Sequence, residues 1–229
     1  MEQSKVWDSI SDLWKEYRQK PLGYVVKLLE EFKGGNVKIL DYGCGSGRNF
    51  VKQEGLMFYG VDFSLQQLKY AEENAKKNKI EVDLQQIKSE KLPFKDEFFD
   101  VCLFISTLHC IETAKKRIIA LEEIYRTLKK DGQMVVSVWN RESLLRRFGK
   151  DSLSLKLDNP TNLSNKKSDK FKDETSKEIF MPWKFNGNVY QRYYYLYERE
   201  ELKKLLENIG FKIVREISDK MNLIFIVEK

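Results

Sequence analysis

The sequence predicts an α/β protein in which a mostly parallel sheet is covered by helices on both faces. Two observations favour this fold. Short apolar runs alternate with helical patterns between residues 37 and 138, and a glycine-rich turn follows the first of these runs directly. The length of 229 residues permits one large domain. We therefore expect a single domain over 1–229.

Composition excludes several classes of protein. No apolar run approaches the ~18 residues of a membrane span, and the first residues lack the basic-then-apolar pattern of a signal peptide. Three cysteines without CxxC spacing indicate neither a disulfide framework nor a metal site. We expect a cytoplasmic protein with no membrane contact. The formal net charge of +6 permits a nucleic-acid partner without requiring one.

The first part of the chain divides into N-terminal helices over 1–36 and a core over 37–140. Residues 4–33 read as two helices broken at Pro21. In the core, the apolar stripes predict helices over 64–78, with Ser64 as the N-cap, and over 113–129. The expected strands of the core are 37–40, 57–61, 82–84, 99–105 and 134–138.

The second part of the chain begins with a predicted mobile insertion over 141–180, because residues 149–178 hold few large apolar side chains. Residues 181–229 then form a substrate-side segment that ends in strands. The pattern predicts a strand over 189–197, a helix over 198–209 and a terminal strand pair over 211–217 and 222–227.

The glycine turn 41–47, with the sequence Asp-Tyr-Gly-Cys-Gly-Ser-Gly, is the strongest motif, and we expect it to open a helix. Its glycines let a ligand lie against bare backbone. Asp62 ends the second strand, where a carboxylate can accept both hydroxyls of a ribose. Arg48 stands where the dinucleotide-binding fingerprint GxGxxG needs its third glycine, so the turn does not match a site for pyrophosphate. Asp41 at the start of the turn, followed by glycines at alternate positions, instead suits a ligand that carries a cationic amine. The alternative is a plain tight turn.

This turn resembles the first signature of class I S-adenosylmethionine-dependent methyltransferases. The segments 92–94 and 98–101 are similar to that family's approach to its fourth strand, and 128–133 to its turn into the fifth. The resemblance implies a Rossmann-like fold with a seven-stranded sheet and S-adenosyl-L-methionine as cofactor. Where the family usually has an acid for adenine, Lys88 and Ser89 stand here, so backbone near 87–89 is expected to contact the base. The implied cofactor-binding residues are Asp41, Gly43, Cys44, Gly45, Gly47, Asp62, Phe63, Lys88, Ser89 and Ile105.

Four further segments resemble the tRNA wobble-uridine carboxymethyl methyltransferases, namely the yeast-type enzyme and the methyltransferase domain of the human AlkB-homologue fusion. These segments are 18–21 (Arg-Gln-Lys-Pro), 106–109, 181–183 and 190–202. The resemblance implies methyl transfer to the carboxylate of 5-carboxymethyluridine in the tRNA anticodon loop. It also implies a heterodimer with a small zinc-binding activator protein, for which Val82–Ile87 is a candidate edge strand.

The same resemblance implies the catalytic residues Arg18, His109, Arg192 and Tyr193. A carboxylate is already ionised at neutral pH, so the reaction needs positioning rather than a general base. Arg18 and Arg192 are candidates to hold the carboxylate bidentately, and His109 to orient the substrate. The alternatives are that Arg18 only ends a helix and that His109, the one histidine of the chain, is a structural core residue.

Two broader alternatives stay open at this stage. Period-two tyrosines over 189–197 would stack anticodon bases or simply pack in a sheet. The chain could also be a methyltransferase for a small quinone-type molecule, or a catalytically silent RNA-binding subunit. Binding of the cofactor discriminates the silent subunit from both enzymes.

Overall fold

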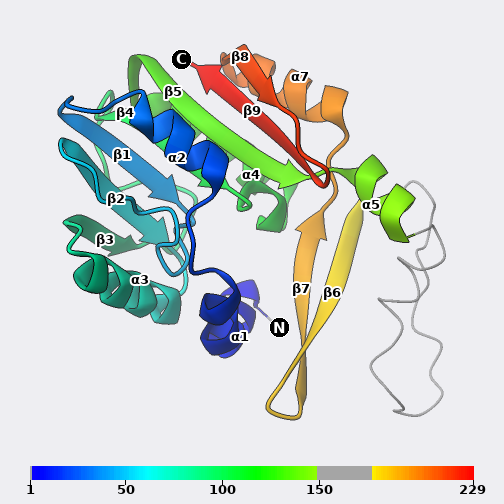
Figure 1. The fold of residues 1–229 in the computed structure, drawn as a ribbon. Helices are drawn as coiled ribbons and strands as arrows, with labels where there is room; N and C mark the ends of the chain where they lie inside the picture. The colour runs from blue at the N-terminus through cyan, green and yellow to red at the C-terminus, as the bar shows by residue number, and fades with distance from the viewer. Residues whose placement is uncertain (1, 149–176) are drawn as a thin grey trace.

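A computed structural model describes residues 2–148 and 177–229, and its centre is a seven-stranded sheet (Figure 1). The strand order is β3-β2-β1-β4-β5-β9-β8, in which β3, β2, β1, β4 and β5 are mutually parallel, while β9 runs antiparallel to β5 and to β8. The α/β prediction is therefore confirmed. The strands are β1 Val37–Tyr42, β2 Leu56–Asp62, β3 Val82–Gln86, β4 Phe99–Ile105, β5 Leu128–Trp139, β8 Lys212–Ile217 and β9 Asn222–Glu228.

Helices cover the two faces of this sheet. On one face, α2 and α3 bury side chains such as Leu29 and Leu68 against β1 and β4. On the other face, α4 and α7 bury Leu121 and Leu202 against β4, β5 and β9. The predicted helices are confirmed, including the break at Pro21. Their bounds are α1 Gln3–Tyr17, α2 Gly23–Glu30, α3 Leu65–Asn78, α4 Ala114–Thr127, α5 Arg141–Phe148 and α7 Arg199–Ile209, with a short 3₁₀ helix, η1, at Leu108–Cys110.

Local caps fix where the helices begin and end. The Ser64 hydroxyl accepts a hydrogen bond from the Gln67 amide at 3.1 Å, so the predicted N-cap of α3 is confirmed. A capping box of Glu198 and Glu201 starts α7, and Gly210 ends it at φ 115°. Such caps satisfy the backbone groups that a helix end leaves unpaired.

A separate hairpin of β6 Glu178–Phe185 and β7 Asn188–Tyr195 stands beyond the sheet, next to α1 (Figure 1). The strand predicted over 189–197 is β7, whereas β6 was not predicted. Asn186 and Gly187 link the two strands, both with positive φ, as a two-residue hairpin turn of this hand requires. The Asn-Gly pair is thus the sequence signal that identifies β6.

Two expectations need correction or limitation. No helix follows the glycine turn: residues 43–49 form successive turns, because Gly43, Gly45 and Gly47 all have positive φ, which a helix cannot contain. Within the predicted insertion 141–180, α5 and the start of β6 are ordered, and residues 149–176 lie outside the described residues. Among described helices, none is long and apolar enough to cross a membrane.

Candidate functional site

The glycine turn lies at the carboxyl ends of β1 and β2, where parallel sheets bind ligands. A Cβ atom on Gly43 would come within 2.4 Å of the Thr107 side chain, and one on Gly47 within 2.5 Å of Phe50. At Gly45 a Cβ would meet only Gln67, at 3.7 Å, so the positive φ alone favours glycine there. The turn therefore keeps open backbone at Gly45 between two tightly packed glycines.

Two buried carboxylates stand behind this turn. Asp62 braces it, since its two oxygens accept hydrogen bonds from the amides of Gly45 and Ser64, both at 2.9 Å. Asp41 is 1% exposed, and its Oδ2 has no hydrogen-bond partner among the described residues. Burial, followed by the charge of Asp62, raises the pKa of Asp41 to about 8, and burial raises the pKa of Asp62 to about 6. The site therefore favours a cationic ligand group.

Two adjoining cavities open beside the turn. The larger, about 390 Å³, is lined by Phe63, by residues 86–90 and by the N-terminal end of α1. The smaller, about 110 Å³, is lined by the glycine turn, Ile105 and side chains of α1. Both share Gly43, Phe63, Thr107 and Cys110, so together they form one continuous site. Most of the predicted cofactor residues line this site or, like the two carboxylates, support it from behind.

Arginines give the smaller cavity a strongly positive wall. Arg18, just after α1, and Arg48, just after the glycine turn, both line it. Burial lowers the pKa of each guanidinium. The pKa of Arg48 is lowered further by the positive charge of Arg18. Arg48 is held in place by donating two hydrogen bonds, of 3.1 and 2.9 Å, to the Lys20 carbonyl. An anionic ligand group would relieve the repulsion between the Arg18 and Arg48 guanidinium groups.

Arg192, on β7, lies behind the same wall rather than on the cavity surface. It is 5% exposed, its Nη1 donates to the Tyr194 hydroxyl at 2.9 Å, and its Nε has no partner among the described residues. Its guanidinium carbon lies 5.5 Å from the centre of the Trp14 ring, and that of Arg18 lies 4.7 Å from it. The charge of Arg192 also helps to lower the pKa of Arg18, after the effect of burial. Arg18 and Arg192 therefore both add positive charge around the Trp14 ring, at the wall of the smaller cavity.

Neither Arg18, Arg48 nor Arg192 makes an ion pair with a carboxylate in the described part of the chain. The arginines that do so there are Arg126, Arg141, Arg146, Arg199 and Arg215. Arg192 is buried, and Arg18 and Arg48 are half-buried. A buried charge without a partner costs several kcal/mol, which proteins accept mainly where a ligand supplies the opposite charge.

A buried glutamine fixes the backbone around Arg192. The Gln3 side chain donates to the Gln191 carbonyl at 3.1 Å and accepts from the Tyr193 amide at 3.0 Å. It thus pairs with β7 on both sides of Arg192, as a neighbouring strand would. Sequence reasoning missed Gln3, because nothing local relates residue 3 to residue 192.

The structure does not bring His109 and Tyr193 into either cavity. His109 is 1% exposed, its ring stacks on Trp139 at 5.4 Å, and burial lowers its pKa to about 3, so it is neutral at physiological pH. The Tyr193 hydroxyl accepts from Arg117 at 3.1 Å and donates to Glu178 at 3.0 Å. Both contacts tie β6 and β7 to α4, which is a structural role.

The tyrosine row proposed for base stacking is also largely buried. Tyr193 is 3% and Tyr197 1% exposed, and the half-buried Tyr195 donates a hydrogen bond to Glu201. These rings pack against α4 and α7, so sheet packing accounts for their period-two pattern. The residues of the smaller cavity that sequence reasoning did not assign to the site are Trp7, Trp14, Ser46, Arg48, Asn49, Ser106, Thr107 and Cys110.

The cofactor implied by the resemblance fits the residues present. The unpartnered Asp41 oxygen and the raised pKa of that carboxyl suit a cationic amine. Each Asp62 oxygen accepts a hydrogen bond from a backbone amide and has a further lone pair for a ribose hydroxyl. The larger cavity, between Phe63 and Lys88, has room for a purine. No three His, Cys, Asp or Glu side chains of residues 2–148 and 177–229 gather as metal ligands.

Comparison with known proteins agrees with this geometry. The family described as a methyltransferase domain matches residues 40–136. The tRNA (carboxymethyluridine(34)-5-O)-methyltransferase of Schizosaccharomyces pombe is 27% identical over 245 residues, covering 98% of this chain and 95% of that protein. The protein of the same name from Arabidopsis thaliana is 29% identical over 138 residues, covering 60% and 32%.

A solved structure shares the fold over nearly the whole chain. The S-adenosylmethionine-dependent methyltransferase of Clostridium acetobutylicum superposes with a TM-score of 0.68 at 15% identity, covering 97% of this chain and 98% of that one. The matched residues 40–136 contain the glycine turn, Asp62 and the larger cavity's 86–90 segment. Residues 40–136 therefore form a class I S-adenosylmethionine-dependent methyltransferase domain, and the chain has a Rossmann-like fold.

Proposed function

We propose that this methyltransferase esterifies the carboxylate of 5-carboxymethyluridine at the wobble position of tRNA. One observation carries the proposal: Arg18 lines the smaller cavity with Arg192 behind it, and neither has a carboxylate partner among the described residues. A carboxylate on the acceptor would supply the missing negative charge. The similarity to the tRNA (carboxymethyluridine(34)-5-O)-methyltransferase of Schizosaccharomyces pombe supports the same acceptor.

The reaction needs no proton transfer. When bound, S-adenosylmethionine supplies a methyl group on a cationic sulfur; the carbon–sulfur bond breaks with its electron pair left on sulfur, and a carbon–oxygen bond forms. A carboxylate is ionised far below neutral pH, so no base has to activate it. The buried, neutral His109 fits this requirement, since it could not relay a proton to either cavity.

The chain's own residues divide the binding work between two cavities. We assign the amine of the cofactor to Asp41, its ribose to Asp62 and its base to the wall formed by Phe63, Lys88 and Ser89. Arg48, beside the glycine turn, suits the carboxylate of the cofactor's amino-acid portion. The guanidinium of Arg18 then remains for the acceptor, and Arg192 adds positive potential behind it.

The proposal includes two macromolecular partners. The acceptor nucleoside would come from a tRNA anticodon loop, and the family resemblance implies a small zinc-binding activator protein. The predicted edge position of Val82–Ile87 is confirmed for β3, which ends the sheet beside β2. An edge strand offers unpaired backbone groups to a partner strand, so β3 is our candidate for the activator's docking site.

Mass spectrometry of modified nucleosides tests this function. An RNA hairpin carrying 5-carboxymethyluridine in its loop is incubated with the protein and S-adenosylmethionine, with and without the activator. The proposal predicts the methyl ester on that nucleoside and none on a hairpin carrying unmodified uridine. Cofactor binding with no ester in either arm would contradict the proposed acceptor, and transfer to a quinone-type phenol would favour the small-molecule alternative.

A further inference from the structure

We propose that Tyr17 and Trp183 form a stacking platform for the nucleobase next to the methyl acceptor in single-stranded RNA. This inference rests on the proposed function for the nature of the substrate. The platform lies where α1 meets the β6–β7 hairpin, and it differs from the tyrosine row of β7, whose rings are packed inside the protein.

Aromatic rings lead from the smaller cavity to the surface. Trp7 and Trp14 line the cavity, with ring centres 5.0 Å apart. Trp14 meets Trp183 at 5.8 Å, and Trp183 meets Tyr17 at 6.2 Å, each pair edge-to-face. A nucleoside held at the cavity would therefore place its neighbour beside the outer rings of this series.

Exposure indicates that the outer end is available to a ligand. Tyr17 is 69% exposed, the highest value among the large hydrophobic side chains of the described residues. Burying such a ring is favourable, so an exposed tyrosine at the mouth of a site is a natural contact for a flat apolar group. Trp183 is half-buried: its indole Nε1 is buried without a hydrogen-bond partner in the described structure, and the part of its ring that stays accessible is what it offers to a base.

The charge around the platform favours a nucleic acid over a neutral apolar partner. Arg18 follows Tyr17 in the chain, and the Arg192 guanidinium lies 4.6 Å from the Trp183 ring centre. Lys20 is exposed two residues further on. Aromatic rings interleaved with cations are the pattern by which proteins hold single-stranded bases and their phosphates. Continuity with the cavity specifies which base: the neighbour of the acceptor.

Fluorescence anisotropy with an anticodon hairpin RNA tests the platform. For the protein saturated with S-adenosylhomocysteine, we expect Tyr17→Ala to raise the Kd for RNA about tenfold, in the range of one lost base stack, and Tyr17→Trp to retain wild-type affinity. Phe180→Ala is the matched control, because Phe180 is 49% exposed on the same hairpin but packs against Tyr193 on the other side. We expect its Kd to be unchanged.

An abasic RNA separates stacking from charge. Removing the base on one side of the acceptor should weaken binding to the wild-type protein and have little further effect on Tyr17→Ala. Equal RNA affinities for Tyr17→Ala and the wild type, additive losses, or no RNA binding by the wild type would each overturn the platform. If only the proposed function is wrong, the result is different: RNA binding still depends on Tyr17, but no methyl ester forms.

Discussion

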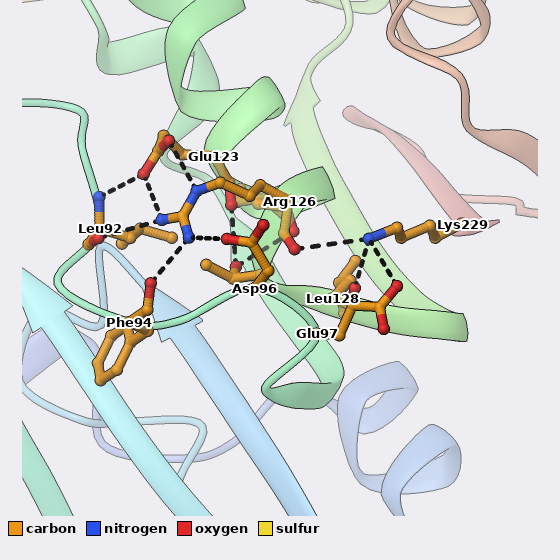
Figure 2. Close-up of polar contacts among 10 residues, drawn as sticks. Leu92, Phe94, Asp96, Glu97, Glu123, Arg126, Leu128 and Lys229 are labelled. Atoms are coloured by element: carbon orange, nitrogen blue, oxygen red, sulfur yellow. Dashed lines mark hydrogen bonds and ion pairs between the residues drawn. The ribbon is translucent and has the colours of Figure 1, made fainter.

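Two arginine clusters of this protein have opposite electrostatic arrangements. At the end of α4, Arg126 is surrounded by acceptors: Glu123 at 3.0 and 2.8 Å, Asp96 at 2.7 Å and the Phe94 carbonyl at 2.8 Å (Figure 2). Glu123 also accepts from the Leu92 amide, so the cluster fastens the β3–β4 loop to α4. Arg18, Arg48 and Arg192, by contrast, have no carboxylate partner among the described residues.

The difference separates two uses of the same side chain. A fully paired guanidinium holds chain segments together and leaves nothing for a ligand. An unpaired one beside a cavity keeps its charge and donors free, at a cost in stability that a bound anion offsets. We therefore expect removal of Arg126 to affect folding, and removal of the cavity arginines to affect binding and turnover.

The largest effect should come from Arg192→Ala. We expect ester formation to fall ~100-fold in kcat/KM, because the variant loses positive potential behind the acceptor carboxylate. Calorimetry should show cofactor affinity within about twofold of wild type, since Arg192 lies outside both cavities. A parallel loss of both quantities would make Arg192 a structural residue.

Arg126→Ala should instead lower the free energy of unfolding by about 2.5 kcal/mol, because Glu123 and the Leu92 carbonyl lose their shared donor. Urea denaturation measures this effect. The matched control is Arg18→Ala, which removes a half-buried charge without a carboxylate partner and should change stability by no more than about 0.5 kcal/mol or increase it. If the two variants are equally destabilised, the distinction between the clusters fails.

Asp41→Asn should stabilise the cofactor-free protein at pH 8 and do so much less near pH 4. The pKa of Asp41 is raised on folding to about 8, so the folded state binds its proton more tightly than the unfolded state. Wild-type stability therefore falls as the pH rises from about 4 to 8, and asparagine removes this dependence. Thermal melts across that range would contradict the assignment if the two proteins share one pH profile.

The smallest of these effects should be that of Arg48→Ala on the cofactor. We expect the Kd for S-adenosylmethionine to rise about fivefold, since the variant loses one partly solvated contact to the carboxylate of the cofactor's amino-acid portion. The Kd for RNA should stay unchanged. If RNA affinity fell and cofactor affinity did not, the assignments of Arg18 and Arg48 would have to be exchanged.

The sequence predicted the fold well because its signals are local. Alternating apolar runs, the Ser64 cap and the glycine turn each act within a few residues. The candidate site was only partly predictable, because it depends on how α1 docks on β7. Gln3, Trp14 and Arg192 are far apart in sequence and meet only through that docking. For the same reason sequence patterns could not show that His109 and Tyr193 point into packed surroundings.

The central claim is that unpaired arginines select an anionic acceptor. The most direct measurement compares wild type and Arg18→Ala for binding to two RNA hairpins, one with 5-carboxymethyluridine and one with its neutral amide. We predict that the wild type prefers the carboxylate by about 30-fold and that Arg18→Ala reduces this preference to about threefold. Equal affinity of the wild type for both hairpins, or a preference unchanged by Arg18→Ala, would contradict the account.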